Sequence, residues 1–292
     1  MHLPTIKNES QIPLRADVLL AQNYPKYSRA ALAKLFTMGE ITKNGVILKA
    51  GQKIKPKERF YANISLLEKP ADNLHLPVIY EDSNVVVIDK PSGVISHASS
   101  LYWDEPSVAS FIRDKVADLG GQRAGIVHRL DRATSGIMIC AKNAKAMSFL
   151  QRQFAGRKVE KEYIAVIENN LEPPQAVIEL PVARNPRKPQ TFKVINTGKQ
   201  ATTEYHVLCA ASKYSLVLLR PKTGRTHQIR VHLSYLKNPI VGDDLYKGKS
   251  APRLFLHAYS LGLVLPNGTS KVFYSPVPRE FIEIFDNEIV TK

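Results

Sequence analysis

One aspartate stands between two arginines in the stretch "GIVHRLDRATSG", residues 125–136. Asp131 lies two positions after Arg129 and directly before Arg132. A carboxylate that works beside a polyanion must stay ionised to act as a nucleophile or a general base, and positive neighbours favour the ionised form. A solvated surface loop would show the same charges. Asp131 is therefore a candidate catalytic residue that needs partners from elsewhere in the chain.

Two residues far along the chain could be such partners. Arg230 lies in "TGRTHQIRVHLSYLKNP", residues 223–239, whose spacing predicts a helix that Thr226 can cap and that Asn238-Pro239 ends. If its face looks into a cleft with Asp131, the two form a buried ion pair that keeps the carboxylate charged. Tyr163 alternates with apolar residues in the expected strand "EYIAVIEN", residues 162–169. It could offer a flat ring to a base and a phenol as acid or base.

Three other motifs fail on closer inspection. "HRLD" is similar to the "HRD" of protein kinases, but the chain lacks a kinase's glycine-rich loop and DFG motif. "GDDLYKGKS", residues 242–250, has one residue too many between its glycines for a nucleotide-binding loop, and its two aspartates would repel phosphate. His227 and His232 are five apart on the expected helix and point in different directions. No metal site is expected.

The composition restricts the class of protein. The chain has 292 residues, 44% of them hydrophobic, and a formal net charge of +15. A globular protein this basic usually meets a polyanion, most often nucleic acid, although charge does not separate RNA from DNA. No run of about 18 apolar residues predicts a membrane span, and the first residues lack the apolar core of a secretory signal. Cys140 and Cys209 lie in apolar runs and are expected to be buried, reduced thiols, which is typical of a cytoplasmic protein.

The charge and the predicted secondary structure change along the chain. Residues 1–65 hold eleven Lys and Arg against four Asp and Glu, a net of +7, around two short helical patterns and a hairpin at Asn44-Gly45. This part is predicted to be a small RNA-binding domain that follows phosphates. Residues 66–76 read as a linker. Residues 77–292 contain many strand patterns and a few helices, which predicts an α+β catalytic domain with a mostly antiparallel sheet.

The motifs, taken in order, resemble those of one enzyme family. "KPSG", "HRLDRATSG", "KEYIAV", "TGRTHQIRVHL", "PIVGDDLY" and "LFLHA" are similar to the motifs of RluA-type pseudouridine synthases, over about residues 77–285. "HRLDxxTSG" together with "TGRTHQIR" is specific to that family. Residues 12–65 resemble a small RNA-binding domain first seen in a ribosomal small-subunit protein. The resemblance implies isomerisation of uridine to pseudouridine in RNA without a cofactor or a metal, by a monomer.

The resemblance also assigns roles to residues. It implies a nucleophilic Asp131, a pairing Arg230 and a Tyr163 that stacks on the target base. Arg129 matches a position that helps to displace a flipped nucleotide. Four further residues are expected to bind the substrate. Lys90, Lys222 and Arg225 are expected to contact phosphates, and His128 is the fourth residue. Whether Asp131 attacks the ribose or removes a proton from it is left open.

One departure and several alternatives remain. Many relatives read "VHP" where this chain has "SHASS", residues 96–100, which affects the expected fit of the substrate at the cleft rim. Large-subunit ribosomal RNA is favoured as the substrate because of the appended basic domain and the chain length, and transfer RNA is the alternative. A non-catalytic RNA-binding or ribosome-assembly role and a DNA-binding protein are the other classes. The second of these lacks a recognition helix suited to base readout.

Overall fold

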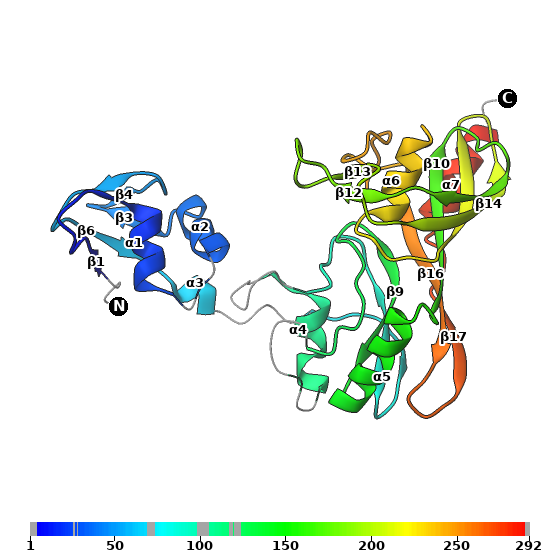
Figure 1. The fold of residues 1–292 in the computed structure, drawn as a ribbon, viewed down its shortest axis with the longest axis horizontal. Coiled ribbons are helices and arrows are strands. Elements are labelled where there is room, and N and C mark those ends of the chain that lie inside the picture. Colours follow the sequence, from blue (N-terminus) through cyan, green and yellow to red (C-terminus); the bar gives the residue numbers. More distant parts are fainter. Residues whose placement is uncertain are drawn as a thin grey trace. The chain divides into compact units, whose positions relative to one another are not determined.

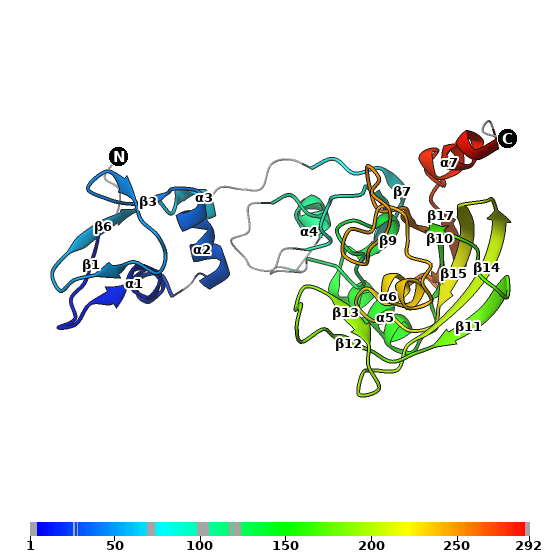
Figure 2. The ribbon, with the colours of Figure 1, turned by 90° about the horizontal axis from the view of Figure 1, so that it is seen from above.

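The computed structural model describes residues 5–25, 27, 29–68, 74–97, 105–116, 119 and 124–289. The chain divides into two compact units, one made mainly of residues up to 74 and the other mainly of those that follow. Each unit is described by itself (Figures 1 and 2). Of the expected linker, residues 66–68 belong to a short helix, and residues 69–73 lie outside the described residues.

The first unit is a small sheet covered by helices. Its elements are β1 (Thr5–Lys7), β2 (Leu14–Arg15), α1 (Ala16–Asn23), α2 (Arg29–Thr37), β3 (Ile41–Lys43), β4 (Val46–Ile47), β5 (Lys53–Ile54), β6 (Arg59–Ala62) and α3 (Ser65–Glu68). Four strands form a sheet in the order β1-β6-β3-β4, and β2 pairs with β5. Leu20, Leu35 and Phe60 are fully buried between the helices and the sheet. This burial of apolar side chains is the main driving force for the unit to fold.

The predicted hairpin at Asn44-Gly45 is confirmed. β3 and β4 pair antiparallel across these two residues, with Thr42 opposite Ile47. Asn44 and Gly45 have φ values of 51° and 79°. Two positive φ angles in a two-residue loop suit the right-handed twist of paired strands, and asparagine followed by glycine adopts them at low cost.

The second unit is built around one large sheet. Its elements are β7 (Val78–Glu81), β8 (Val85–Lys90), α4 (Val108–Ile112), a 3₁₀ turn (Arg113–Lys115), β9 (Ser135–Ala141), α5 (Ala144–Ala155), β10 (Glu160–Glu168), β11 (Gln175–Glu179), β12 (Val182–Arg184), β13 (Phe192–Val194), β14 (Thr202–Ala210), β15 (Tyr214–Pro221), α6 (Gln228–Tyr235), β16 (Leu256–Val264), β17 (Ser270–Tyr274) and α7 (Glu280–Ile289). Nine strands form the sheet in the order β11-β14-β15-β10-β16-β9-β8-β7, with β17 on β16. Among the described strand pairs only β9 and β16 run parallel. The predicted α+β class with a mostly antiparallel sheet is confirmed.

The middle of this sheet brings two distant segments together. β16 lies between β9 and β10, pairing His257 with Ser135 on one side and Ala258 with Tyr163 on the other. The loop that ends in β9 carries Asp131, so that loop and Tyr163 on β10 are two strands apart. At the start of β9, Gly136 has a φ of 113°, and a Cβ there would overlap the backbone of Ala258. Only glycine fits this close approach of two strands.

The helices of the second unit differ in how they begin. α5 starts at a capping asparagine, because the Asn143 side chain accepts a hydrogen bond from the amide of Ala146 at 2.9 Å. α6 begins at Gln228, and the residue before it is His227, which has a φ of 57° and makes no capping hydrogen bond with its side chain. The prediction that Thr226 caps this helix is therefore wrong. α6 packs against β13 and β14. No helix in the described part of the chain combines the length and the apolar character needed to cross a membrane.

The two cysteines differ in environment. Cys140 is fully buried in β9, as predicted, whereas Cys209 on β14 is exposed. The pairing of β14 with β15 shifts register between Val207 and Cys209. Leu208 and Ala210, on either side of Cys209, are exposed as well, and the pairing of β14 with β11 ends at His206. This end of β14 is therefore open on both faces, which the apolar run in the sequence does not reveal.

Candidate active site

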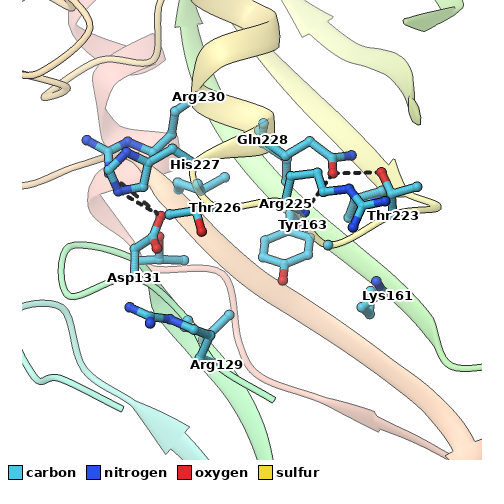
Figure 3. Close-up of a pocket in the computed structure, with 16 residues that line it drawn as sticks. Arg129, Asp131, Lys161, Tyr163, Thr223, Arg225, Thr226, His227, Gln228 and Arg230 are labelled. Carbon is cyan, nitrogen blue, oxygen red and sulfur yellow. Dashed lines mark hydrogen bonds and ion pairs between the residues drawn. The ribbon is translucent and has the colours of Figure 1, made fainter. Parts of the chain in front are cut away.

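A pocket in the second unit collects residues from the Asp131 loop, β10 and the start of α6 (Figure 3). Its lining includes Arg129, Asp131, Tyr163, Arg225, His227 and Arg230. All three residues predicted to be catalytic therefore face one hollow, although they are up to 99 positions apart in the sequence. Concave sites with several converging polar groups are where ligands and substrates bind most often.

The Asp131 loop is held by the "KPSG" segment. Ser92 Oγ donates to the carbonyl of Ala133 at 2.7 Å, and the amide of Gly93 donates to that of Arg132 at 2.8 Å. Ser96 Oγ donates to the carbonyl of Leu130 at 2.8 Å and accepts from its amide at 3.1 Å. These bonds lie on both sides of Asp131 in the chain. They fix the loop backbone, and this fixes the direction of the carboxylate.

Arg230 faces two carboxylates at different distances. Its Nε and Nη2 donate to Oδ2 and Oδ1 of Asp243, each at 2.7 Å. Its Nη1 lies 3.7 Å from Oδ2 of Asp131. Burial acts to lower the pKa of Arg230, but the hydrogen bonds and charge of Asp243 outweigh it and raise the pKa above its ordinary value. The guanidinium is thus a fixed positive charge, held by Asp243 and presented to Asp131.

A histidine is the second partner of Asp131. His227 Nε2 lies 3.6 Å from Oδ2 of Asp131, and its Nδ1 is 2.8 Å from the hydroxyl of Tyr246. Burial lowers the pKa of His227 below its ordinary value, while the charge of Asp131 acts in the opposite direction. The positive φ of His227 is uncommon for a residue with a side chain. Strained backbone of this kind clusters at functional sites.

Tyr163 projects from β10 into the same pocket (Figure 3). Burial raises its pKa, and the nearby charge of Asp131 raises it further. The phenol therefore keeps its proton at neutral pH. A neutral aromatic ring on the wall of a pocket can stack on a nucleobase and can donate a hydrogen bond from its hydroxyl group.

The loop before α6 is fixed by one buried glutamine. Gln228 Oε1 accepts from Thr223 Oγ1 at 2.7 Å and from the amide of Arg225 at 3.0 Å. Its Nε2 donates to the carbonyl of Thr202 at 2.9 Å and to Thr203 Oγ1 at 3.0 Å. These four bonds use most of the capacity of the amide group. The "TGRTHQ" segment therefore has a defined shape on the pocket wall.

The residues predicted to bind phosphate fall into two groups. Arg129 is exposed and lines the pocket, and Arg225 lines it with its Nε bonded to the carbonyl of Gln200 at 3.1 Å. Lys222 is exposed and forms an ion pair with Glu204 at 2.9 Å. It lines a neighbouring hollow that shares Lys161 and Pro221 with the pocket. These three side chains remain candidates for contacts with a polyanion.

The predicted roles of Lys90 and His128 in substrate binding are wrong. Lys90 is fully buried, and its Nζ donates to the carbonyls of Pro91, Val94 and Arg132 at 3.0, 2.8 and 3.3 Å. Its ammonium group stabilises the loop backbone and does not reach the pocket. His128 stacks on Phe154 with a 4.6 Å separation of ring centroids, and its Nε2 accepts from the amide of Ile139. Burial lowers the pKa of His128 to about 3, so this neutral ring packs in the core and does not line the pocket in which it was predicted to bind the substrate.

Of the departure at residues 96–100, only the first two residues are described. Ser96 is buried, and its hydroxyl bonds the backbone of Leu130 in the Asp131 loop. Residues 98–100 lie outside the described residues. Ser96 thus holds the Asp131 loop, whereas the sequence placed the whole stretch at the rim.

Sequence reasoning missed three residues of this site. Asp243 and Tyr246 stand in the family motif "PIVGDDLY", and His227 stands in "TGRTHQIRVHL". Neither these motifs nor the rejected nucleotide-loop and metal-site interpretations gave the three residues a role in the site. Tyr246 places its hydroxyl on His227, and the guanidinium of Arg230 lies 5.0 Å from the centre of its ring. The available signal was two adjacent aspartates, Asp243 and Asp244, in a segment that is otherwise rich in turn residues. Charges are seldom buried unless they are paired.

Comparisons with known proteins point to one family. The family model described as RNA pseudouridylate synthase matches residues 84–235. A ribosomal large subunit pseudouridine synthase D from Borreliella burgdorferi is 35% identical, covering 94% of this chain and 89% of the relative. An uncharacterized RNA pseudouridine synthase from Aquifex aeolicus is 36% identical over 93% and 92% of the two chains. The structure of human RNA pseudouridylate synthase domain containing 4 superimposes with a TM-score of 0.58 and 26% identity, covering 72% of this chain and 92% of that one.

Proposed function

This chain belongs to the RNA pseudouridylate synthase family, isomerases that form pseudouridine in RNA, and we propose that Asp131 carries the reaction on a flipped uridine of large-subunit ribosomal RNA. The observation that supports the role of Asp131 is its place in the pocket, 3.7 Å from Arg230 and 3.6 Å from His227. Both partners approach Oδ2. Oδ1 is the oxygen that we assign to the reaction.

The reaction replaces the carbon–nitrogen bond between the ribose and the base with a carbon–carbon bond. The bond from nitrogen 1 of uracil to carbon 1′ breaks, the base turns, and carbon 5 bonds to carbon 1′. Carbon 5 loses its proton and nitrogen 1 ends with one, so the product is an isomer. Asp131 begins this sequence by attacking carbon 1′ or by removing a proton from the ribose. Either step requires an ionised carboxylate, and the guanidinium of Arg230 lies 3.7 Å from it.

The target atoms are hidden inside stacked RNA, so the nucleotide must leave the stack. Flipping costs a few kcal/mol. Stacking of the base on Tyr163 returns about 1–3 kcal/mol of that. Arg129 and Arg225 on the pocket wall suit the phosphates of the displaced nucleotide.

The choice of ribosomal RNA rests on two observations. The relatives from Borreliella burgdorferi and Yersinia pestis carry large-subunit names and cover 94% and 95% of this chain. The first unit has a net charge of +7 up to residue 65, with exposed side chains at Lys49, Lys53 and Lys55. We assign this unit to RNA binding through phosphates. Transfer RNA is the alternative substrate.

Mapping of pseudouridine in total RNA, with and without the gene, tests this function. We expect one or a few positions in large-subunit ribosomal RNA to lose pseudouridine when the gene is deleted. Wild type supplied in trans restores them, and the Asp131→Ala variant does not. If the positions that lose pseudouridine lie in transfer RNA, the substrate is transfer RNA and not ribosomal RNA. Restoration by Asp131→Ala would overturn the catalytic role of Asp131.

A further inference from the structure

A chain of polar contacts leads from the backbone of β13 to Asp131. The amide of Phe192 donates to the hydroxyl of Tyr246 at 2.8 Å. That hydroxyl lies 2.8 Å from His227 Nδ1, and His227 Nε2 lies 3.6 Å from Asp131 Oδ2. The aromatic rings of Phe192 and Tyr246 meet the imidazole edge-on, with centroids 5.5 and 5.6 Å away. The ring orientation of His227 is therefore fixed from two sides.

The contacts favour one position for the imidazole proton. The Phe192 amide can only donate, so His227 Nδ1 is the acceptor that the described contacts offer to the proton of the buried Tyr246 hydroxyl. Burial raises the pKa of Tyr246 to about 12, and this proton is retained. A neutral imidazole that accepts at Nδ1 carries its proton on Nε2. Nε2 is the atom that faces Asp131.

We propose that Tyr246 is a positioning residue that fixes the tautomer of His227, and that His227 thereby donates its Nε2 proton to Oδ2 of Asp131 in the reacting complex. This inference rests on the proposed function of Asp131. The distance of 3.6 Å is long for a hydrogen bond in the free enzyme, but catalytic hydrogen bonds commonly shorten when the substrate binds. The donated proton and Arg230 together hold Oδ2 and leave Oδ1 to react.

The same short segment also controls the other partner of Asp131. Asp243 binds Arg230 through both oxygens, and the amide of Tyr246 donates to Asp243 Oδ1 at 3.3 Å. The Arg230 guanidinium lies 5.0 Å from the centre of the Tyr246 ring. "GDDLY" is therefore the common support of both groups that face Asp131. It explains why the buried Asp243 belongs beside a site that binds RNA.

The burial of His227 favours the neutral ring whose tautomer matters. Asp131 and Asp243 stabilise its protonated form, whereas Arg230 and Arg129 oppose it. Burial is the largest effect and lowers the pKa of His227. A neutral donor can support the carboxylate without adding a second full positive charge. An imidazolium would carry protons on both nitrogens, and Tyr246 would then have no tautomer to choose.

The first test reads the proton directly. Histidine labelled with ¹⁵N reports the tautomer of each ring through the shifts and couplings of its two nitrogens. The His227 signals are assigned by their loss in His227→Gln. We expect the Nε2–H tautomer in wild type and a gain of Nδ1–H in Tyr246→Phe. An Nδ1–H tautomer in wild type overturns the proposal, and this outcome does not depend on activity or on the RNA substrate.

The second test uses two replacements of the histidine. Glutamine can place an N–H near the position of Nε2, whereas asparagine places its amide near Nδ1, toward Tyr246. We expect His227→Gln to keep at least tenfold more single-turnover rate than His227→Asn, on a large-subunit ribosomal RNA transcript labelled at carbon 5 of uridine. Their affinities for RNA should remain equal. Equal rates in the two variants would contradict donation from Nε2.

The third test asks whether Tyr246 acts through His227. Tyr246→Phe should lower the single-turnover rate about tenfold in wild type, the effect of one hydrogen bond to a charged system. It should change the rate less than twofold in the His227→Gln background, because glutamine has no tautomer to fix. Tyr205→Phe is the matched control: Tyr205 is also buried, and its hydroxyl donates to the carbonyl of Pro173 at 2.8 Å, outside the pocket. An equal loss in both backgrounds would overturn the link.

Discussion

Arg230 is bound more closely by Asp243 than by Asp131. Two hydrogen bonds of 2.7 Å join the guanidinium to Asp243, which is almost fully buried, whereas Asp131 is 3.7 Å away and partly open to the pocket. The arginine is thus anchored by one carboxylate and presented to another. This arrangement fixes its position before RNA binds, so little reorganisation is needed during the reaction.

Replacing Asp243 with asparagine should reduce both activity and stability. The substitution keeps the shape but removes the charge that holds Arg230, and this leaves a buried cation whose nearest carboxylate is Asp131. We expect a decrease of about 3–5 kcal/mol in the free energy of unfolding and a 10–100-fold lower single-turnover rate, with RNA affinity within about threefold of wild type. Urea unfolding and a single-turnover assay measure these quantities. Asp244→Asn, at the exposed neighbouring position, is the control and should change neither.

Asp131 should be required for chemistry but not for binding. We expect Asp131→Ala and Asp131→Asn to form no detectable pseudouridine, because neither side chain is a nucleophile or a base. RNA binding should survive, since the contacts with phosphate come from other side chains. Pseudouridine formation and filter binding on the same RNA separate the two effects. Turnover retained in either variant would refute the mechanism.

The sequence predicted the residues of the pocket better than their partners. Asp131, Tyr163 and Arg230 stand in motifs, and the structure places all three on one pocket, while their roles remain proposals. The pairing of Arg230 with Asp243 depends on how the turn after α6 folds back over that helix. Periodicity within a helix carries no information on that approach. Which carboxylate binds Arg230 is therefore decided by the tertiary fold. The motifs alone suggested that this carboxylate was Asp131.

Burial explains the wrong assignments. Lys90 follows four buried valine and isoleucine residues in β8 and continues into the interior, where three carbonyls bind its ammonium group. A lysine beside a cleft and a lysine beneath it look alike in a sequence. Cys209 shows the opposite error, because the end of β14 beyond its pairing with β11 is exposed on both faces despite its apolar sequence. The strands and the hairpin were predictable because their signals are local.

The first unit should contribute to affinity through charge. Changing Lys53 and Lys55 to glutamine removes two exposed positive charges. Each phosphate contact that is lost reduces the slope of log affinity against log salt by about 0.7–0.9. We therefore expect a slope shallower by up to about two and weaker binding at low salt, with an unchanged rate at saturating RNA. Titrations over a series of salt concentrations give the slope.

A matched pair in the second unit controls for total charge. Lys145 and Lys237 are also exposed and do not line the pocket. Their replacement with glutamine removes the same charge and should leave the slope close to that of wild type. If both pairs lower the slope equally, the first unit has no special part in RNA binding.

Lys90 should make the stability of the enzyme depend on pH. Burial is the largest effect on its ammonium group and lowers its pKa from 10.5 to about 7, against the opposing attraction of Asp131. Between these pKa values the unfolded chain binds a proton that the folded chain has released, so stability increases as pH rises. We expect the free energy of unfolding to rise from pH 7 to 9.5, by at most about 1.4 kcal/mol per pH unit from this residue.

Lys90→Met isolates this contribution, because methionine fills similar space without a titrating group. The variant should be less stable than wild type above pH 9, where the neutral amine still donates to the carbonyls, and its stability should rise less with pH. Lys161, whose pKa burial also lowers, contributes equally to both proteins. Urea unfolding at half-unit steps of pH measures the two slopes, with Lys145→Met at an exposed site as the control. Parallel curves for wild type and Lys90→Met would show that the folded and unfolded chains hold the Lys90 proton equally, and the buried amine would then be charged throughout this range.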